Sequence, residues 1–250
     1  MSSIPTGRVL EKLDEYLGRN DYAGAKKHLL YWLSEAEAID DGRGILLLSN
    51  ELMGLCRKLG EGDRAIGYAE KALLQTKKMG IENNVGAATT YLNSATVYKA
   101  FGRASDAVPL FERARAVYEN NLAPDDERLG GLYNNMALAF VDLGRFEEAQ
   151  LLYEKAIAVM SLNKNAEPEQ AITYLNMASA AEARYGLEGA QDIISDCAEK
   201  AMELLDGCKH RTDGDYAFAC EKCATVFEYY GYFLYKKELN ERSRRIYEGS

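Results

Sequence analysis

Proline is scarce in this sequence, with only 4 among 250 residues. Because proline interrupts helices and is frequent in disordered chains, its scarcity suits long helices and argues against disorder. Hydrophobic residues make up 47 % of the chain, yet no apolar run approaches the length of a membrane-spanning helix. The composition predicts a soluble, ordered chain without a membrane segment.

Signals for secretion are also lacking. Residues 1–7 do not contain the charged and apolar regions of a signal peptide. The cysteines number 5, which is odd, and they are unevenly placed, so they do not suggest a disulfide framework. These features predict a cytoplasmic protein with reduced thiols.

Signals for catalysis and for nucleic-acid binding are missing as well. The sequence has no GxSxG, HExxH or GxxxxGK motif, and its two histidines, His28 and His210, lie far apart. The 39 acidic residues exceed the 30 basic ones, which gives a net charge of -9 that repels a phosphate backbone, and no basic stripe is apparent. The sequence predicts a non-enzymatic protein with no cofactor and no nucleic-acid partner.

What the sequence does contain is a pattern that recurs about every 42 positions. It is clearest between Tyr133 and Ala156, where the residues predict a helix, a tight turn at Gly144 and a second helix. An alanine opens each second helix, and a bulky residue such as Phe140 or Tyr153 is expected to fill the space beside a small one. The marker alanines are Ala25, Ala65, Ala107, Ala149 and Ala190.

At these residues the chain resembles a tetratricopeptide repeat protein. A period near 42 exceeds the basic repeat of about 34 residues and resembles the long repeats of kinesin light chains. The resemblance implies an all-α, right-handed superhelical solenoid of about six helix pairs, forming one domain over residues 6–248. The expected repeats are 8–40, 41–83, 84–125, 126–167, 168–209, and a degenerate C-terminal unit at 213–248.

Three asparagines, Asn93, Asn135 and Asn176, share one register position in successive first helices. The resemblance implies that these helices line a concave groove, where a column of carboxamides can pair with the backbone of an extended peptide. The alternative is that these asparagines are merely solvated. Other residues predicted to face the groove are Asn134, Thr89, Thr96, Lys99, Leu138, Ser179, Tyr229 and Tyr232.

The C-terminal unit is rich in tyrosine and departs from the pattern. We expect Tyr230 and Leu234 to be packed, Ser243 to take the place of the marker alanine, and Arg242, Arg244 and Arg245 to form a polar exterior. The unit is predicted to cap the solenoid. The alternative is a pocket for a ligand or for a second copy of the chain, which would make a homodimer.

A weak metal signal lies in the same region. Cys208, His210, Cys220 and Cys223 supply four potential zinc ligands, but one CxxC on a helix is common as core packing, so no metal is predicted.

The predicted function is that of a scaffold that holds an extended protein or peptide segment in the groove. The alternatives are a peptide-sensing regulatory protein and a self-associating scaffold.

Overall fold

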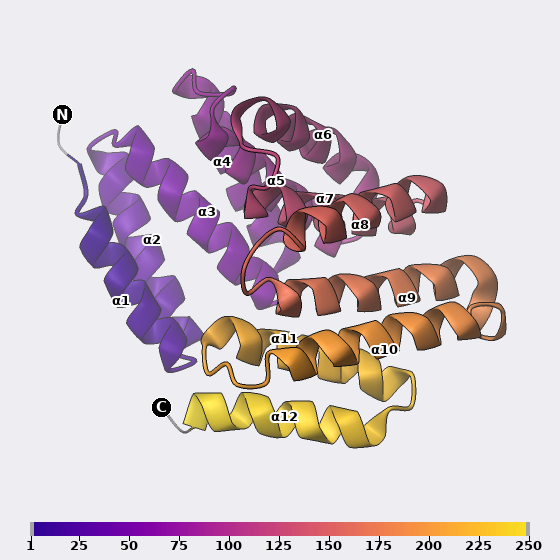
Figure 1. The fold of residues 1–250 in the computed structure, drawn as a ribbon. Helices are drawn as coiled ribbons and strands as arrows, with labels where there is room; N and C mark the ends of the chain where they lie inside the picture. Colours follow the sequence, from indigo (N-terminus) through magenta and orange to yellow (C-terminus); the bar gives the residue numbers. More distant parts are fainter. Residues whose placement is uncertain (1–2, 249–250) are drawn as a thin grey trace. The chain divides into compact units, whose positions relative to one another are not determined.

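The computed structural model describes residues 3–248, and these residues contain helices but no strands (Figure 1). The helices belong to two compact units, residues 1–121 and 122–250. The first unit contains α1 (Thr6–Gly18), α2 (Tyr22–Ala38), α3 (Gly42–Lys58), α4 (Gly62–Lys78), α5 (Val85–Ala100) and α6 (Ala104–Asn121). The second contains α7 (Glu127–Asp142), α8 (Phe146–Met160), α9 (Glu167–Gly189), α10 (Gln191–Gly207), α11 (Gly214–Tyr229) and α12 (Phe233–Glu248).

Consecutive helices pair as hairpins, from α1 with α2 to α11 with α12. Each hairpin turn contains one residue with a positive φ, a conformation that glycine adopts without a Cβ clash. Gly144 has φ 71°, so the predicted stop of the first helix is confirmed. The corresponding residues are Asn20, Gly60, Gly102, Gly144, Gly186 and Gly231. The all-α fold of six helix pairs is therefore confirmed for residues 3–248.

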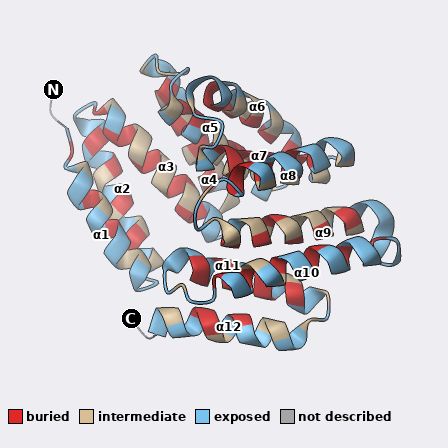
Figure 2. Ribbon diagram, in the orientation of Figure 1, coloured by how far each residue is buried: buried red, intermediate tan, exposed pale blue. Residues whose placement is uncertain are grey.

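Small residues lie where the two helices of a hairpin approach each other. All five marker alanines are fully buried, as are Ala95, Ala137 and Ala178 of the first helices. Phe140 and Tyr153 are also buried, as their predicted role beside the small residues requires. Figure 2 shows the buried residues along the faces on which paired helices meet. The repeat spacing is thus the spacing of close helix contacts.

In the first unit, α2 also packs against α3, α4 against α5, and α3 against α5. Its core includes Leu29, Leu48 and Leu52, all with no exposed surface. Burying a leucine contributes about 1.5–3 kcal/mol relative to leaving it exposed, so these positions stabilise the stacking of neighbouring hairpins. Asp41 is 8 % exposed and caps α3 by accepting from Gly44 N, at 3.1 Å.

In the second unit, α9 packs against α7, α8 and α11 as well as α10. Its core includes Leu175, Phe227 and Leu239. Helical geometry in α9 is interrupted at Gly186, with φ 73° and ψ 166°, and this interruption makes the turn toward α10. The shared contacts of α9 join the three hairpins of this unit.

The C-terminal hairpin differs from its prediction at three positions. Ser243 is buried, but it lies late in α12, and the fourth residue of that helix is Lys236. Leu234 is 87 % exposed and so is not a packed residue. Arg242 is 8 % exposed, so it is part of the interior rather than of a polar exterior. The absence of a marker alanine left the register of this hairpin undefined by the sequence.

Among residues 3–248, no helix has the length and apolar character needed to cross a membrane.

Candidate functional site

The predicted groove asparagine of the first unit is paired with an asparagine of the preceding hairpin. Asn93 on α5 donates from Nδ2 to Oδ1 of Asn50 on α3, at 3.2 Å. Asn50 in turn donates to the Leu46 backbone oxygen at 2.9 Å and to Thr90 Oγ1 at 3.1 Å. Both asparagines are half-buried. The carboxamides therefore bridge neighbouring first helices, and Asn50 belongs to this site although it lies outside the predicted column.

A second carboxamide pair lies between α7 and α9 of the other unit. Asn176 donates from Nδ2 to Oδ1 of Asn134, at 3.0 Å. Asn135 instead donates to the Gly131 backbone oxygen of its own helix, at 2.8 Å. The residue that pairs with Asn176 is therefore Asn134 and not its neighbour Asn135, which the predicted column contained.

Each pair leaves hydrogen-bonding capacity unused. Within residues 3–248, no partner lies within hydrogen-bonding distance of Asn93 Oδ1, Asn176 Oδ1 or Asn134 Nδ2. A carboxamide offers an acceptor and two donors, so each pair can still accept from a ligand N–H or donate to a ligand C=O. Since these groups are half-buried and held by a partner, they are already oriented before any ligand arrives.

A pocket of about 200 Å³ lies beside the first pair. It is lined by Asn50, Glu51, Met53, Gly54, Arg57, Asn93, Thr96 and Val97 from α3 and α5. Burial raises the pKa of the Glu51 carboxyl above its usual value, and the nearby charge of Asp14 adds to this rise. The pocket combines amide groups with one acidic and one basic side chain, which suits a polar peptide segment.

The other residues that were predicted to face the groove differ in their hydrogen bonds and in their burial. Thr96 and Ser179 donate to backbone oxygens four residues earlier in their own helices, at 2.8 and 3.2 Å. Thr89 lies 2.8 Å from the Tyr118 hydroxyl on α6. Lys99 and Leu138 are half-buried. A role for these residues in peptide binding stays a prediction.

The predicted tyrosines lie at a second pocket, of about 510 Å³. Tyr229 and Tyr230 both donate to the carboxylate of Glu182 on α9, at 2.6 and 2.9 Å, and their ring centroids are 5.1 Å apart. Burial raises the pKa of Tyr230 to about 12, whereas the bond to Glu182 is the main cause of the raised pKa of Tyr229. Tyr232 packs edge-on against Phe227 at 5.7 Å. These contacts tie α11 to α9 and leave Tyr229 68 % exposed.

The four residues of the weak zinc signal are not assembled as a metal site. Cys208, Cys220 and Cys223 are buried, whereas His210 is exposed. Burial raises the pKa of Cys208 to about 11, and it also raises that of Cys223. Because metals bind the thiolate, such thiols are poor ligands. In the part of the chain that the structure describes, no three His, Cys, Asp or Glu side chains come together as metal ligands.

Repeated helix hairpins, with small residues at the crossings of the first five and a residue of positive φ at each turn, define a helical repeat protein. The family model for the tetratricopeptide repeat matches residues 45–120 and 86–161. Residues 45–161 thus match the tetratricopeptide repeat family, and the fold of the chain is structurally similar to the TPR-like repeats of kinesin light chains. No curated protein matches its sequence.

Several solved structures share the fold. The nearly identical TPR-like repeats of a Podosopora anserina kinesin light chain superpose with a TM-score of 0.55 at 19 % identity, over 80 % of this chain and 94 % of that one. BtubC from P. vanneervenii gives a TM-score of 0.55 at 19 % identity, over 93 % and 91 %. NprR in complex with its cognate peptide NprX gives 0.56 at 17 % identity, over 97 % and 68 %. At these identities the likeness defines the fold alone.

Proposed function

We propose that this protein is a non-enzymatic module that binds an extended peptide segment on the first helices of a unit, through the carboxamide pair of that unit. Tetratricopeptide repeats are in general protein- and peptide-binding folds, and NprR, which shares this fold, has been solved with its cognate peptide. The observation that carries the proposal is that the pairs Asn50–Asn93 and Asn134–Asn176 orient half-buried amides whose remaining atoms have no partner within residues 3–248.

The mechanism follows from the chemistry of the amide group. A carboxamide can bond the N–H and C=O of any residue, so it recognises an extended backbone whatever its side chains are. The partner asparagine fixes each amide in place, which lowers the entropy lost on binding. Selectivity among sequences then comes from neighbouring pockets, such as the one bounded by Glu51 and Arg57.

The test begins with peptides selected from a random linear library on the purified protein. The tightest peptide is synthesised, and its affinity is measured by calorimetry for the native protein, Asn93→Ala, Asn176→Ala and the matched control Asn120→Ala. Asn120 is exposed on α6 and bonds only its own helix, at Ala116 O. A lost neutral hydrogen bond costs about 0.5–1.5 kcal/mol. We therefore expect binding up to about tenfold weaker in Asn93→Ala or in Asn176→Ala, and unchanged binding in Asn120→Ala.

Methylation of single backbone nitrogens in the peptide separates backbone recognition from side-chain recognition. We expect one or two N-methyl positions to abolish binding, while alanine at the same positions has little effect. Unchanged affinity in both Asn93→Ala and Asn176→Ala, with folding intact by urea unfolding, would remove the basis of the proposal.

A further inference from the structure

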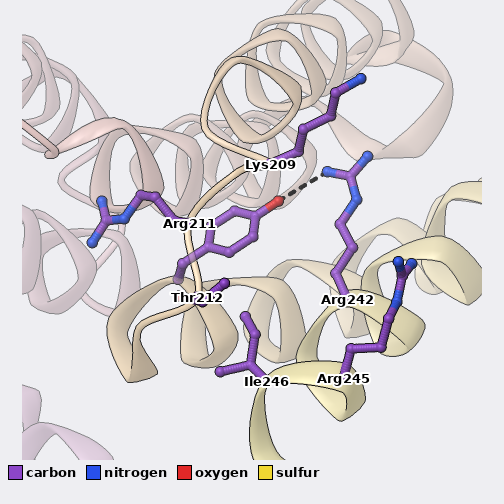
Figure 3. A pocket seen from close by; sticks show the side chains of 7 residues that line it. Lys209, Arg211, Thr212, Arg242, Arg245 and Ile246 are labelled. Carbon is purple, nitrogen blue, oxygen red and sulfur yellow. Dashed lines mark hydrogen bonds between the residues drawn. The ribbon is translucent and has the colours of Figure 1, made fainter. Parts of the chain in front are cut away.

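Basic side chains are concentrated in one pocket of this acidic chain. The pocket, of about 450 Å³, lies in the second unit between the loop that follows α10 and the last helix, α12 (Figure 3). Lys209 and Arg211 come from the loop, and Arg242 and Arg245 come from α12. The chain as a whole has a net charge of -9, so the excess of cations here is local.

Two of these four cations already have carboxylate partners. Arg211 donates to both oxygens of Asp213 at 2.8 Å, and in Figure 3 its guanidinium points away from Arg242. Arg242 donates to Asp206 at 2.6 Å and also to Glu238. These two arginines hold the loop and α12 in place, and their charge is neutralised.

The buried Arg242 also fixes the floor of the pocket. Its guanidinium donates to the Tyr216 hydroxyl at 3.0 Å, the bond drawn in Figure 3, and to the Leu205 backbone oxygen at 3.3 Å. Tyr216 is 1 % exposed, and Ile246 adds an apolar wall. Because this floor is buried and partly apolar, a charge placed against it is less screened than on a fully open surface.

The other two cations, Lys209 and Arg245, have no acidic partner in the part of the chain that the structure describes. Within residues 3–248, no carboxylate lies within 4.0 Å of the Lys209 amine or the Arg245 guanidinium. Arg245 donates to the Glu241 backbone oxygen of its own helix, at 3.3 Å. Lys209 and Arg245 line the same pocket from different elements, and Thr212 adds a hydroxyl to the lining. The pocket therefore offers two uncompensated positive charges and a further donor.

We propose that this pocket binds the anionic group of a partner, a phosphate monoester or a carboxylate, between Lys209 and Arg245. Lysine supplies a mobile point charge, and the arginine fork can bond two oxygens of one group. A pocket of this volume is within the range that accommodates a small ligand or a single side chain. This site goes beyond the carboxamide surface and does not depend on it.

The test uses inorganic phosphate and acetate as probes at constant ionic strength, with chloride as the reference anion. Amide resonances of the isotopically labelled full chain are followed by NMR in the native protein, Lys209→Met, Arg245→Met and the matched control Lys237→Met. Lys237 is an exposed lysine of α12 outside the lining. Since one charge-assisted hydrogen bond contributes about 1.5–3 kcal/mol, we expect affinity to fall at least about tenfold in each pocket variant and to stay unchanged in the control.

The two probes identify the group that binds. Saturable shifts confined to residues 209–216 and 242–246 with phosphate alone indicate a phosphoryl group, whereas equal or stronger shifts with acetate indicate a carboxylate. Either result, if lost in Lys209→Met and Arg245→Met while the rest of the spectrum is unchanged, supports the proposal. It is overturned if neither probe gives saturable shifts in the native protein, or if the pocket variants respond as the control does.

Discussion

Tyr153 carries a buried hydroxyl group without a hydrogen-bond partner among residues 3–248. The residue lies on α8, has no exposed surface and fills the space beside the small residues of its hairpin. Its burial strongly raises the pKa of the phenol, with Asp142 as a smaller cause. A polar group in this position lost its bonds to water on folding and gained none in return. Tyr153→Phe is therefore expected to stabilise the protein.

The size of this stabilisation follows from the removal of the hydroxyl group alone. An unsatisfied buried polar group costs about 1–3 kcal/mol, and phenylalanine keeps the ring while leaving only the small space of one oxygen. The net gain is expected to be about 1 kcal/mol, which corresponds to a rise in Tm of about 2–4 °C for a chain of this length. Urea unfolding followed by circular dichroism, together with calorimetry, measures both quantities.

Tyr216→Phe is the control in the same unit. Tyr216 is also buried, but its hydroxyl donates to the Leu205 backbone oxygen and accepts from Arg242, each at 3.0 Å. Loss of the Tyr216 hydroxyl is expected to cost about 1–3 kcal/mol, because it removes two hydrogen bonds from a buried site. If Tyr153→Phe instead destabilises the protein by a similar amount, the Tyr153 hydroxyl is hydrogen-bonded in solution and the reasoning from its isolation is refuted.

Two further predictions concern the C-terminal hairpin. Arg242→Met is expected to lower the free energy of unfolding by about 2 kcal/mol, since it removes the bonds from the buried guanidinium to the buried Tyr216 hydroxyl and to the half-exposed carboxylates of Asp206 and Glu238. No loss relative to Lys237→Met would contradict this. Asp213 caps α11, and its bonds to the Arg211 guanidinium lower the pKa of its carboxyl from 3.8 to about 2. The charged carboxylate therefore stabilises the folded protein fully above about pH 4, and this contribution is lost as the pH falls toward 2. Asp213→Asn keeps a capping side chain but removes the charge. The difference in unfolding free energy between the native protein and this variant, measured by urea titration, is therefore expected to shrink between about pH 4 and pH 2. A difference that stays constant over this range would exclude the charge as its cause.

The repeat architecture was predictable because close helix crossings constrain the sequence directly. Wherever two helices of a hairpin approach, a large side chain would hold them apart, so the spacing of Ala65, Ala107 and Ala149 records the spacing of the crossings. A positive φ at each hairpin turn adds a second marker, as at Gly144. Both constraints act locally, so a single sequence displays them.

The last hairpin was not predictable in the same way because its second helix lacks the small residue. The structure places Lys236 as the fourth residue of α12, where α8 has Ala149, and its amine reaches Glu228 at 2.9 Å. A lysine can bury its stem and keep its charge at the surface, so it substitutes for alanine without leaving a pattern. The prediction that Ser243 takes the marker position was therefore wrong.

The hydrogen-bond partners of the asparagines could not be predicted from the repeat spacing. Adjacent helical residues differ by about 100° around the axis, so the choice between Asn134 and Asn135 as the partner of Asn176 depends on the rotation of α7 against α9. The cationic pocket depends on packing between segments far apart in sequence. Its only signal was the presence of basic residues on both sides of one hairpin, at Lys209 and at Arg245.

The two proposed sites would contribute differently to recognition. Carboxamides that bond a peptide backbone provide affinity with little dependence on sequence, so selectivity has to come from side-chain contacts. Lys209 and Arg245 offer such a contact, because an uncompensated positive pair favours an anionic side chain and disfavours a cationic one. The Asn134–Asn176 pair and the cationic pocket belong to the same unit. A partner that combines an extended segment with one acidic or phosphorylated residue therefore matches the chemistry of both.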